Sequence, residues 1–227
     1  MQQNIDLTDR VAVITEATSG IGLALAACAA ERGMKVALVD RDQERLTGAL
    51  KRLGNNEART MAVCLDMGEL NEVRKLAQCI EFELGPPWLL CNNCETSVEL
   101  NLRAMTHGVQ VFAPLLAERG EGHIVNLVSA DSRSASCPAA YAAATHAIVG
   151  LSESLYRELD SLGSLVGVTL VCPARRAGNA RILSPQHPYP DSHPARPRAS
   201  DILQPERLAQ QIFGAVTSRR FHLFNAS

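Results

Sequence analysis

A glycine-containing turn near the amino terminus is the first place where residue types and spacing could support chemistry. Residues 15–22 have the sequence TEATSGIG and join an apolar run to an alanine-rich segment with helical spacing. Backbone N–H groups of such a turn, with the amino end of the following helix, can hold a pyrophosphate. A Gly-x-Gly pair alone is weak evidence, because glycines there also allow a helix and a strand to pack closely.

Asp40 strengthens the interpretation as a phosphate-binding turn. It ends the next apolar run, about 20 residues after the turn, where a carboxylate can hydrogen-bond the ribose hydroxyls of NAD. A carboxylate at this place also disfavours NADP, because it repels the additional phosphate. The turn and Asp40 together predict a dinucleotide site that prefers NAD.

Two other groups of potential ligands are weaker candidates. Cys91 and Cys94 have the Cys-x-x-Cys spacing of a redox pair or of half a metal site. No second Cys or His pair with ligand spacing accompanies them, so we expect buried apolar packing for strand-end cysteines and no metal site. His187 and His193 lie in a proline-rich stretch, where solvated loop residues are the simpler interpretation.

Alternating apolar runs and helical segments must position these residues. We expect strands at 11–15, 36–39, 61–64, 88–91, 124–128, 168–171 and 221–224, and helices at 20–32, 42–53, 69–84, 96–118, 139–162 and 205–216. Thr96 and Glu99 have the spacing of a capping box at the start of the fourth helix. Strict alternation predicts an α/β doubly wound parallel sheet, Rossmann-like, in a single domain over residues 1–227.

Residues 173–204 interrupt this alternation. Five prolines between positions 185 and 197 make regular structure unfavourable there. A loop of this length in a compact domain is usually functional or disordered, and this one follows the sixth strand at the edge of the sheet where ligands bind. The segment is therefore either a lid or a disordered insertion.

The composition excludes several classes of function. The chain has 227 residues, is 46% hydrophobic and 20% charged, and carries a net charge of -2, so it has no basic field for nucleic acid. No apolar run is long enough to cross a bilayer, and the amino terminus lacks a signal peptide's apolar stretch. Its seven cysteines do not resemble a secreted disulfide framework. We expect a cytoplasmic protein with a small-molecule substrate and neither nucleic-acid nor membrane partners.

The ordered motifs resemble the short-chain dehydrogenase/reductase family. The family pattern Thr-Gly-x-x-x-Gly-x-Gly aligns with residues 15–22, and matches follow at Asp66, Asn92, Asn93 and Pro173. The segments HIVNLVS, YAAATHAIVGLSESLYREL and RRFHLF resemble one bacterial subgroup of this family. The resemblance implies hydride transfer between a nicotinamide cofactor and an alcohol or carbonyl carbon.

The resemblance also assigns roles to individual residues. It implies that Tyr141 donates or accepts the proton, that Ser129 hydrogen-bonds the substrate oxygen, and that Asn101 holds a water of the proton relay. The cofactor-binding residues that it implies are Thr15, Ser19, Gly20, Ile21, Gly22, Asp40, Asp66 and Asn92.

Departures from the family pattern fall on the chemistry. The family's lysine, four residues after the tyrosine, is Thr145 here. Thr145 is uncharged, so it cannot lower the pKa of Tyr141 as a neighbouring cation would. Glu16 replaces a glycine of the turn, which is unfavourable if that position needs a positive φ, and its carboxylate would repel the cofactor's phosphates.

Further departures lie beside the nicotinamide end. Glu95 adds a second carboxylate, and Ala174 replaces the glycine that follows the family's proline. The connection from the fourth strand to Asn101 is much shorter than usual in the family, and one residue is missing between Ser129 and Tyr141. The capping box favours a natural rearrangement, and an omitted segment is the alternative.

Three functions remain open. The first is an NAD-preferring oxidoreductase of low or unusual activity on a small alcohol or ketone. The second is a pseudoenzyme with a binding or assembly role. The third is chemistry without hydride transfer, as in the halohydrin dehalogenases that resemble this family, although those also need a cation near the tyrosine. Because the departures cluster on the cofactor contacts and on the activating partner of the tyrosine, we expect lost or severely impaired activity.

The sequence also suggests contacts outside the site. The family's usual homodimer or homotetramer uses the helices around Asn101 and Tyr141, and an apolar face of the second helix would serve either such self-association or sheet packing. This face consists of Ile148, Leu151, Leu155 and Leu159.

Arg175 and Arg176 would be able to pair with Glu16 or Glu95 and fill the phosphate region. No residue pattern identifies the substrate.

Overall fold

The computed structural model describes residues 5–93, 98–128, 139–172 and 204–224. The strands are β1 (Val11–Thr15), β2 (Lys35–Asp40), β3 (Thr60–Cys64), β4 (Pro87–Asn92), β5 (Gly122–Leu127), β6 (Val166–Cys172) and β7 (His222–Phe224). The helices are α1 (Gly20–Glu31), α2 (Gln43–Arg52), α3 (Leu70–Glu83), α4 (Val98–Arg119), α5 (Ala139–Ser161) and α6 (Pro205–Thr217).

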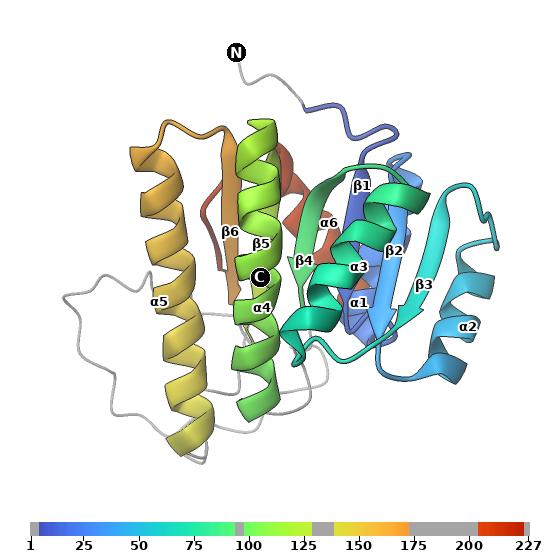
Figure 1. The fold of residues 1–227 in the computed structure, drawn as a ribbon, viewed down its shortest axis with the longest axis horizontal. Coiled ribbons are helices and arrows are strands. Elements are labelled where there is room, and N and C mark those ends of the chain that lie inside the picture. Colours follow the sequence, from blue (N-terminus) through green and yellow to red (C-terminus); the bar gives the residue numbers. More distant parts are fainter. Residues whose placement is uncertain (1–4, 94–97, 129–138, 173–203, 225–227) are drawn as a thin grey trace.

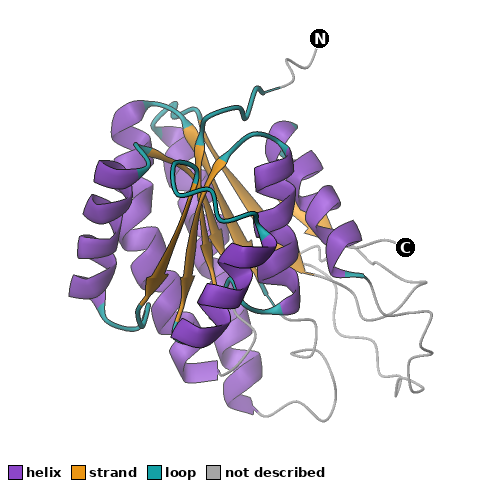
Figure 2. Ribbon diagram, turned by 90° about the vertical axis from the view of Figure 1, so that its right-hand side faces the viewer, coloured by secondary structure: helices purple, strands orange, loops and turns teal. Residues whose placement is uncertain are grey.

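The strands form one parallel sheet with the order β3-β2-β1-β4-β5-β6-β7 (Figure 1). Helices cover both faces of the twisted sheet (Figure 2). The core on one face contains residues of α1, α2 and α6, and the core on the other contains residues of α3, α4 and α5. The predicted doubly wound, Rossmann-like fold is confirmed, and the direction of winding reverses between β1 and β4.

Local sequence accounts for the element boundaries. Every residue of β1 is buried, as expected for an apolar strand covered on both faces. The side chains of Ser19 and Asp42 cap α1 and α2, since they accept hydrogen bonds from the N–H groups of Gly22 and Arg45. All predicted strands and helices are present, with ends that differ by at most two residues where the chain is described. The capping box at Thr96 and residues 173–203 lie outside the described residues.

The apolar face of α5 is used within the chain. Ile148, Leu155 and Leu159 are buried, and Leu151 packs against the same core. This confirms sheet packing as the role of that face. A contact between copies of the chain would have to use the opposite side of the helix.

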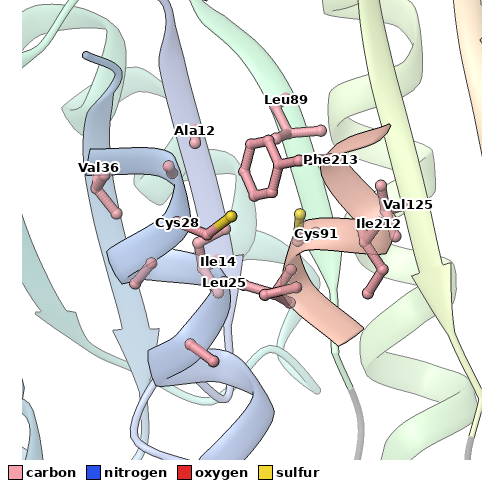
Figure 3. Packing of buried hydrophobic residues seen from close by; sticks show 14 of the residues in the cluster. Ala12, Ile14, Leu25, Cys28, Val36, Leu89, Cys91, Val125, Ile212 and Phe213 are labelled. Atoms are coloured by element: carbon pink, nitrogen blue, oxygen red, sulfur yellow. The ribbon is translucent and has the colours of Figure 1, made fainter. Parts of the chain in front are cut away.

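Cys91 is a core residue of β4. It is 1% exposed and lies with Cys28 and Phe213 between α1, β4 and α6 (Figure 3). Burial raises the pKa of the Cys91 thiol well above its ordinary value and that of Cys28 to about 11. Both thiols therefore stay protonated and pack as small apolar groups, while Cys94 lies outside the described residues.

The described residues contain no group of three or more His, Cys, Asp or Glu side chains that could hold a metal ion. Within the same residues, no helix combines the length and the apolar character that crossing a membrane requires.

A buried histidine links β5 to β6. His123 Nε2 lies 2.7 Å from the hydroxyl of Thr169, which itself donates to the carbonyl oxygen of Arg220 at 2.7 Å. Because that hydroxyl proton is used, Nε2 must carry the imidazole proton and donate it. The ring lies against Gly167, where a Cβ would collide with it. Burial, with a smaller contribution from Arg219, lowers the pKa of His123 from 6.5 to about 3.

The depressed pKa makes stability depend on pH. Above pH 6.5 the imidazole is neutral in both the folded and the unfolded chain; as the pH falls toward about 3, only the unfolded chain binds the proton. We expect His123 to lower the free energy of unfolding by up to about 1.4 kcal/mol per pH unit in this window. Urea titrations of the wild type and of His123→Gln, which keeps a donor without titrating, measure the difference. Equal pH slopes for the two proteins would contradict the assignment.

Candidate functional site

A cavity of about 860 Å³ opens at the carboxyl ends of β1, β2 and β3. Its walls are the turn before α1, the ends of β2 and β3, and the beginning of α2, with Asn93 after β4 and Ala104 of α4. Five of the predicted cofactor residues line it, namely Thr15, Ser19, Gly20, Asp40 and Asp66. The position next to the winding reversal is where doubly wound sheets bind ligands.

The turn before α1 has one residue in the left-handed region of backbone conformation. Glu16 has a φ of 45°, which confirms that this position requires the left-handed region. A side chain in this region costs roughly 1 kcal/mol relative to glycine. The turn also closes tightly on the helix: a Cβ on Gly22 would lie 2.9 Å from the Cα of Ala17 and closer still to the carbonyl oxygen of Glu16. Gly22 therefore serves the close approach of helix and turn.

Asn93 holds this turn in place. Its side-chain amide donates to the hydroxyl of Ser19 at 2.9 Å and to the carbonyl oxygen of Glu16 at 3.4 Å. Its backbone N–H donates to the hydroxyl of Thr15 at 2.9 Å. Such bonds from a neighbouring strand can sustain an unfavourable backbone conformation. The side-chain oxygen of Asn93 is buried, with no hydrogen-bond partner among the described residues.

Asn92 has a different role from the one that the family resemblance implied. Its side chain points into the interior, where it donates to the Oδ1 of Asn126 at 3.0 Å, and it is not among the residues that line the cavity. Asn126 in turn donates to the hydroxyl of Ser152 on α5 at 2.9 Å. This buried chain fixes α5 against β4 and β5. Asn92 is the last residue of β4 and Asn93 directly follows it, and only Asn93 lines the cavity.

Asp40 lies where the sequence predicts it, and it already binds the turn. Its Oδ2 accepts hydrogen bonds from the backbone N–H of Thr18 at 2.9 Å and from its hydroxyl at 2.6 Å. Its Oδ1 accepts from the N–H of Arg41 at 2.7 Å. A ribose diol can use the remaining lone pairs or displace the Thr18 hydroxyl. The contribution of Thr18 was missed, since nothing in the sequence indicates which turn residue reaches Asp40.

Asp66, in the loop after β3, also lines the cavity. It accepts a hydrogen bond from the N–H of Gly68 at 2.8 Å, and His107 of α4 binds the carbonyl oxygen of Met67 at 3.1 Å. A carbonyl can only accept, so the Nδ1 of His107 is the donor. These bonds tie the loop after β3 to α4. Apolar side chains that suit a flat ring line the cavity as well, namely Val39, Leu65, Met67 and Ala104.

The predicted catalytic residues are placed only in part. Asn101 lies in the first turn of α4 and Tyr141 in the first turn of α5, where the structure describes the backbone alone. Ser129 lies outside the described residues, as do Glu95, Ala174, Arg175 and Arg176. The predicted pairing of Arg175 and Arg176 with Glu16 or Glu95 therefore stays a prediction. Ile21 and Gly22 belong to the beginning of α1 and do not line the cavity.

The chain has no lysine on either of the two helices that carry Asn101 and Tyr141. Its three lysines lie elsewhere. Lys35 begins β2 and donates to the carbonyl oxygen of Leu84, Lys51 lies in the last turn of α2, and Lys75 of α3 pairs with Glu72 at 2.8 Å. Thr145 is half-buried on α5, one turn after Tyr141. No lysine can therefore take over the role that this position has in the family.

The cavity fits one half of a nicotinamide dinucleotide better than the other. Asp40 and the apolar wall suit an adenosine, and the turn has the backbone shape for a pyrophosphate. The Glu16 carboxylate, however, belongs to the turn on which the phosphates would lie. Of the charged residues that line the cavity, five are acidic and two are arginines: Glu16, Asp40, Asp42, Glu44 and Asp66 against Arg41 and Arg45. Acidic side chains therefore outnumber basic ones among the described residues that line the cavity.

Comparisons with known proteins agree with the fold and with the motifs. A family model described as short chain dehydrogenase matches residues 10–179. The chain is 27% identical to 1-deoxy-11-beta-hydroxypentalenate dehydrogenase of Streptomyces avermitilis, with 96% of this chain and 85% of that protein covered. It is 31% identical to the uncharacterized oxidoreductase YxnA of Bacillus subtilis, with 92% and 63% covered.

A solved structure gives the same result. A short chain dehydrogenase/reductase from Burkholderia phymatum, in complex with NAD, is 30% identical and has a TM-score of 0.79, with 97% of this chain and 90% of that chain covered. The alignment with the Streptomyces avermitilis enzyme extends over 240 residues, more than the 227 of this chain, so that enzyme has segments that this chain lacks. The family model, which covers most of the sequence, shows that this chain belongs to the short-chain dehydrogenase/reductase family of oxidoreductases.

Proposed function

We propose that this protein is a short-chain dehydrogenase/reductase homologue, derived from an NAD-dependent alcohol or carbonyl oxidoreductase, in which cofactor binding and hydride transfer are lost or severely impaired. Its role is then that of a pseudoenzyme, in binding or assembly. The observation that carries the proposal is the position of the three lysines, none of which lies on α4 or α5.

The absence of a lysine from α5 matters because Tyr141 would have to transfer a proton. A bound nicotinamide cofactor supplies or accepts the hydride, and Tyr141 would have to donate or accept the proton. An ordinary phenol titrates near pH 10, so roughly one molecule in a thousand is ionised at neutral pH. Thr145 offers no positive charge that would raise this fraction. Tyr141 is therefore a poor base in the oxidative direction, although a protonated phenol can still donate in the reductive one.

The second candidate is an active, NAD-preferring oxidoreductase with a rearranged site, acting on a small alcohol or ketone. Two observations favour it: Asp40 ends β2 beside the turn, and Asn93 and Asp40 hold that turn in a binding shape. A relative that binds NAD also has this fold.

Removal of the tyrosine hydroxyl separates the two candidates. We expect Tyr141→Phe to leave any residual oxidation of small alcohols by NAD or NADP unchanged, because an unactivated phenol is a poor base. Initial rates at pH 7 to 10 for wild type and variant measure this. A drop of about a hundredfold or more, the usual contribution of a working acid–base group, would establish the active candidate instead.

Thr145→Lys provides the matched control in the same assay. It places an ammonium one helical turn after Tyr141, so turnover that appears in this variant and disappears in the double variant with Tyr141→Phe shows that the rest of the site is competent. Continued inactivity of Thr145→Lys would assign the loss to the cofactor contacts instead.

We further propose that the protein forms a homodimer or homotetramer through the outer face of α5. Three exposed positions on this face carry small residues, namely Ala147, Gly150 and Ser154. A Cβ on Gly150 meets nothing within 4 Å, so Gly150→Arg does not disturb the monomer and favours the helix. Light scattering should show dissociation of this variant but not of Gly48→Arg, a control on α2 with equal free space. An unchanged assembly in Gly150→Arg would contradict this contact.

We also propose that the protein is cytoplasmic. All four cysteines whose side chains the structure describes, Cys28, Cys64, Cys79 and Cys91, are free thiols. This is usual for reducing compartments. The distribution of the tagged chain between cell fractions tests this assignment.

A further inference from the structure

We propose that the hydroxyl of Thr18 is an internal competitor for Asp40, an autoinhibitory contact that weakens the binding of any ligand with two neighbouring hydroxyl groups. The inference rests on the proposed function, since it concerns the cavity in which we place the impaired cofactor site. It names a device within the chain that regulates this cavity, whereas the proposed function concerns whether hydride is transferred.

The chain itself occupies most of the Asp40 carboxylate. Four hydrogen bonds from described residues end there. Oδ2 accepts from the backbone N–H of Thr18 at 2.9 Å and from the Thr18 hydroxyl at 2.6 Å. Oδ1 accepts from the N–H groups of Arg41 at 2.7 Å and of Asp42 at 3.4 Å. Since a carboxylate has about four lone-pair sites, only the long bond from Asp42 leaves an acceptor site weakly used.

The Thr18 hydroxyl is the one of these four donors that a side-chain rotation can remove. The other three are backbone N–H groups, which cannot leave unless the chain changes shape. A diol brings two donors and needs two acceptor sites. Oδ1 offers the site that Asp42 uses weakly, so the second site has to come from Oδ2. The Thr18 hydroxyl must then turn away before both hydroxyls of the ligand can bind.

The attachment of the turn to β2 does not depend on this hydroxyl. The backbone N–H of Thr18 binds Asp40, and the N–H of Ala17 donates to the carbonyl oxygen of Val39 at 3.2 Å. Both bonds persist when the Thr18 side chain rotates. The hydroxyl bond is short and its acceptor is a carboxylate, so it is one of the stronger hydrogen bonds of the turn. It therefore stabilises the chain without a ligand and has to be broken when a diol binds.

Thr18→Val tests the inference through two measurements on the full chain. Valine keeps the branched shape and the backbone N–H but lacks the hydroxyl. We expect the affinity for adenosine, measured by calorimetry, to rise by about tenfold or more, because one hydrogen bond to a charged group no longer has to be broken. Urea unfolding should show a lower stability for the same variant. Adenosine is a suitable probe because it carries the diol without a phosphate.

The opposite signs of the two effects distinguish autoinhibition from a purely structural contact, whose loss would lower both stability and affinity. Thr18→Ser, which keeps the hydroxyl, is the matched control and should bind adenosine as the wild type does. 2′-Deoxyadenosine has a single hydroxyl on the ring carbons in place of the diol and can use the weakly occupied site of Oδ1. Its affinity should therefore change less in Thr18→Val than that of adenosine.

Two results would overturn the inference. Adenosine binding to Thr18→Val that is no tighter than binding to the wild type would show that the hydroxyl does not compete. Absence of adenosine binding to Thr18→Val would show that Asp40 does not hold a diol even when it is released. Neither result decides the proposed function, which depends on turnover that requires Tyr141. Tyr141-dependent turnover, in turn, would refute the proposed function and leave the ratio of the adenosine affinities unchanged.

Discussion

Glu16→Gly is expected to raise the affinity for NAD by up to about a thousandfold. Two like charges about 4 Å apart repel by roughly 4 kcal/mol at an effective dielectric constant of 20, and removal of the carboxylate abolishes this term at the turn. The same change frees a residue that has a φ of 45°. Glycine adopts this conformation without strain, so the free energy of unfolding should rise by about 1 kcal/mol. Calorimetry with NAD and urea unfolding measure the two effects.

Glu16→Gln separates the two causes. It removes the charge but retains a Cβ in the left-handed region, so the affinity for NAD should increase while stability stays close to that of the wild type. If neither variant binds NAD more tightly than the wild type, the carboxylate is not what impairs the cofactor site. Glu95, Ala174 and the short connection between β4 and α4 would then be the departures that remain as explanations.

Gly22→Ala is expected to lower the free energy of unfolding by about 2–4 kcal/mol. The added methyl group would lie 2.9 Å from the Cα of Ala17 and even closer to the carbonyl oxygen of Glu16. Both neighbours are backbone atoms, so no flexible side chain can move aside. The turn itself must shift, and this would also break the bond from the Asn93 amide to Glu16.

Gly20→Ala is the matched control for that experiment. A Cβ on Gly20 would have its nearest neighbour, the Cγ of Pro205, at 3.7 Å, which is ordinary contact. Chemical denaturation should therefore give nearly unchanged stability for Gly20→Ala and a clear loss for Gly22→Ala. Equal stability of the two variants would mean that helix α1 does not approach the turn as closely as the structure shows.

Most of the fold could be predicted because burial on both faces leaves a simple pattern. Strands covered on two sides must be continuously apolar, as in β1 and β4, and helices between them stop at identifiable residues such as Gly33, with a φ of 74°. The predicted ends of several helices and strands differ from the observed ends by one or two residues. The helix expected to extend to residue 32 ends at Glu31, because Arg32 already has a ψ of 10°.

The site was predictable only as far as it depends on local sequence. The turn, the positive φ of Glu16 and the place of Asp40 follow from spacing along the chain. The choice between Asn92 and Asn93 does not, since it depends on which side of β4 faces the cavity once the strand is packed. The bonds from Thr18 to Asp40 and from Asn93 to Ser19 join residues 22 and 74 positions apart, and local patterns carry no signal for them.

The most direct test is a calorimetric titration of NADH into the unmodified chain at pH 7 and about 0.15 M salt. Calorimetry is preferable to tryptophan emission because Trp88 lies at the amino end of β4, where Glu121 accepts a hydrogen bond from its indole N–H at 3.2 Å, at the opposite edge of the sheet from the cavity. Lost or severely impaired cofactor binding predicts no saturation below about 1 mM NADH. A dissociation constant in the micromolar range would contradict it, and the chain would then have to be regarded as a cofactor-binding dehydrogenase.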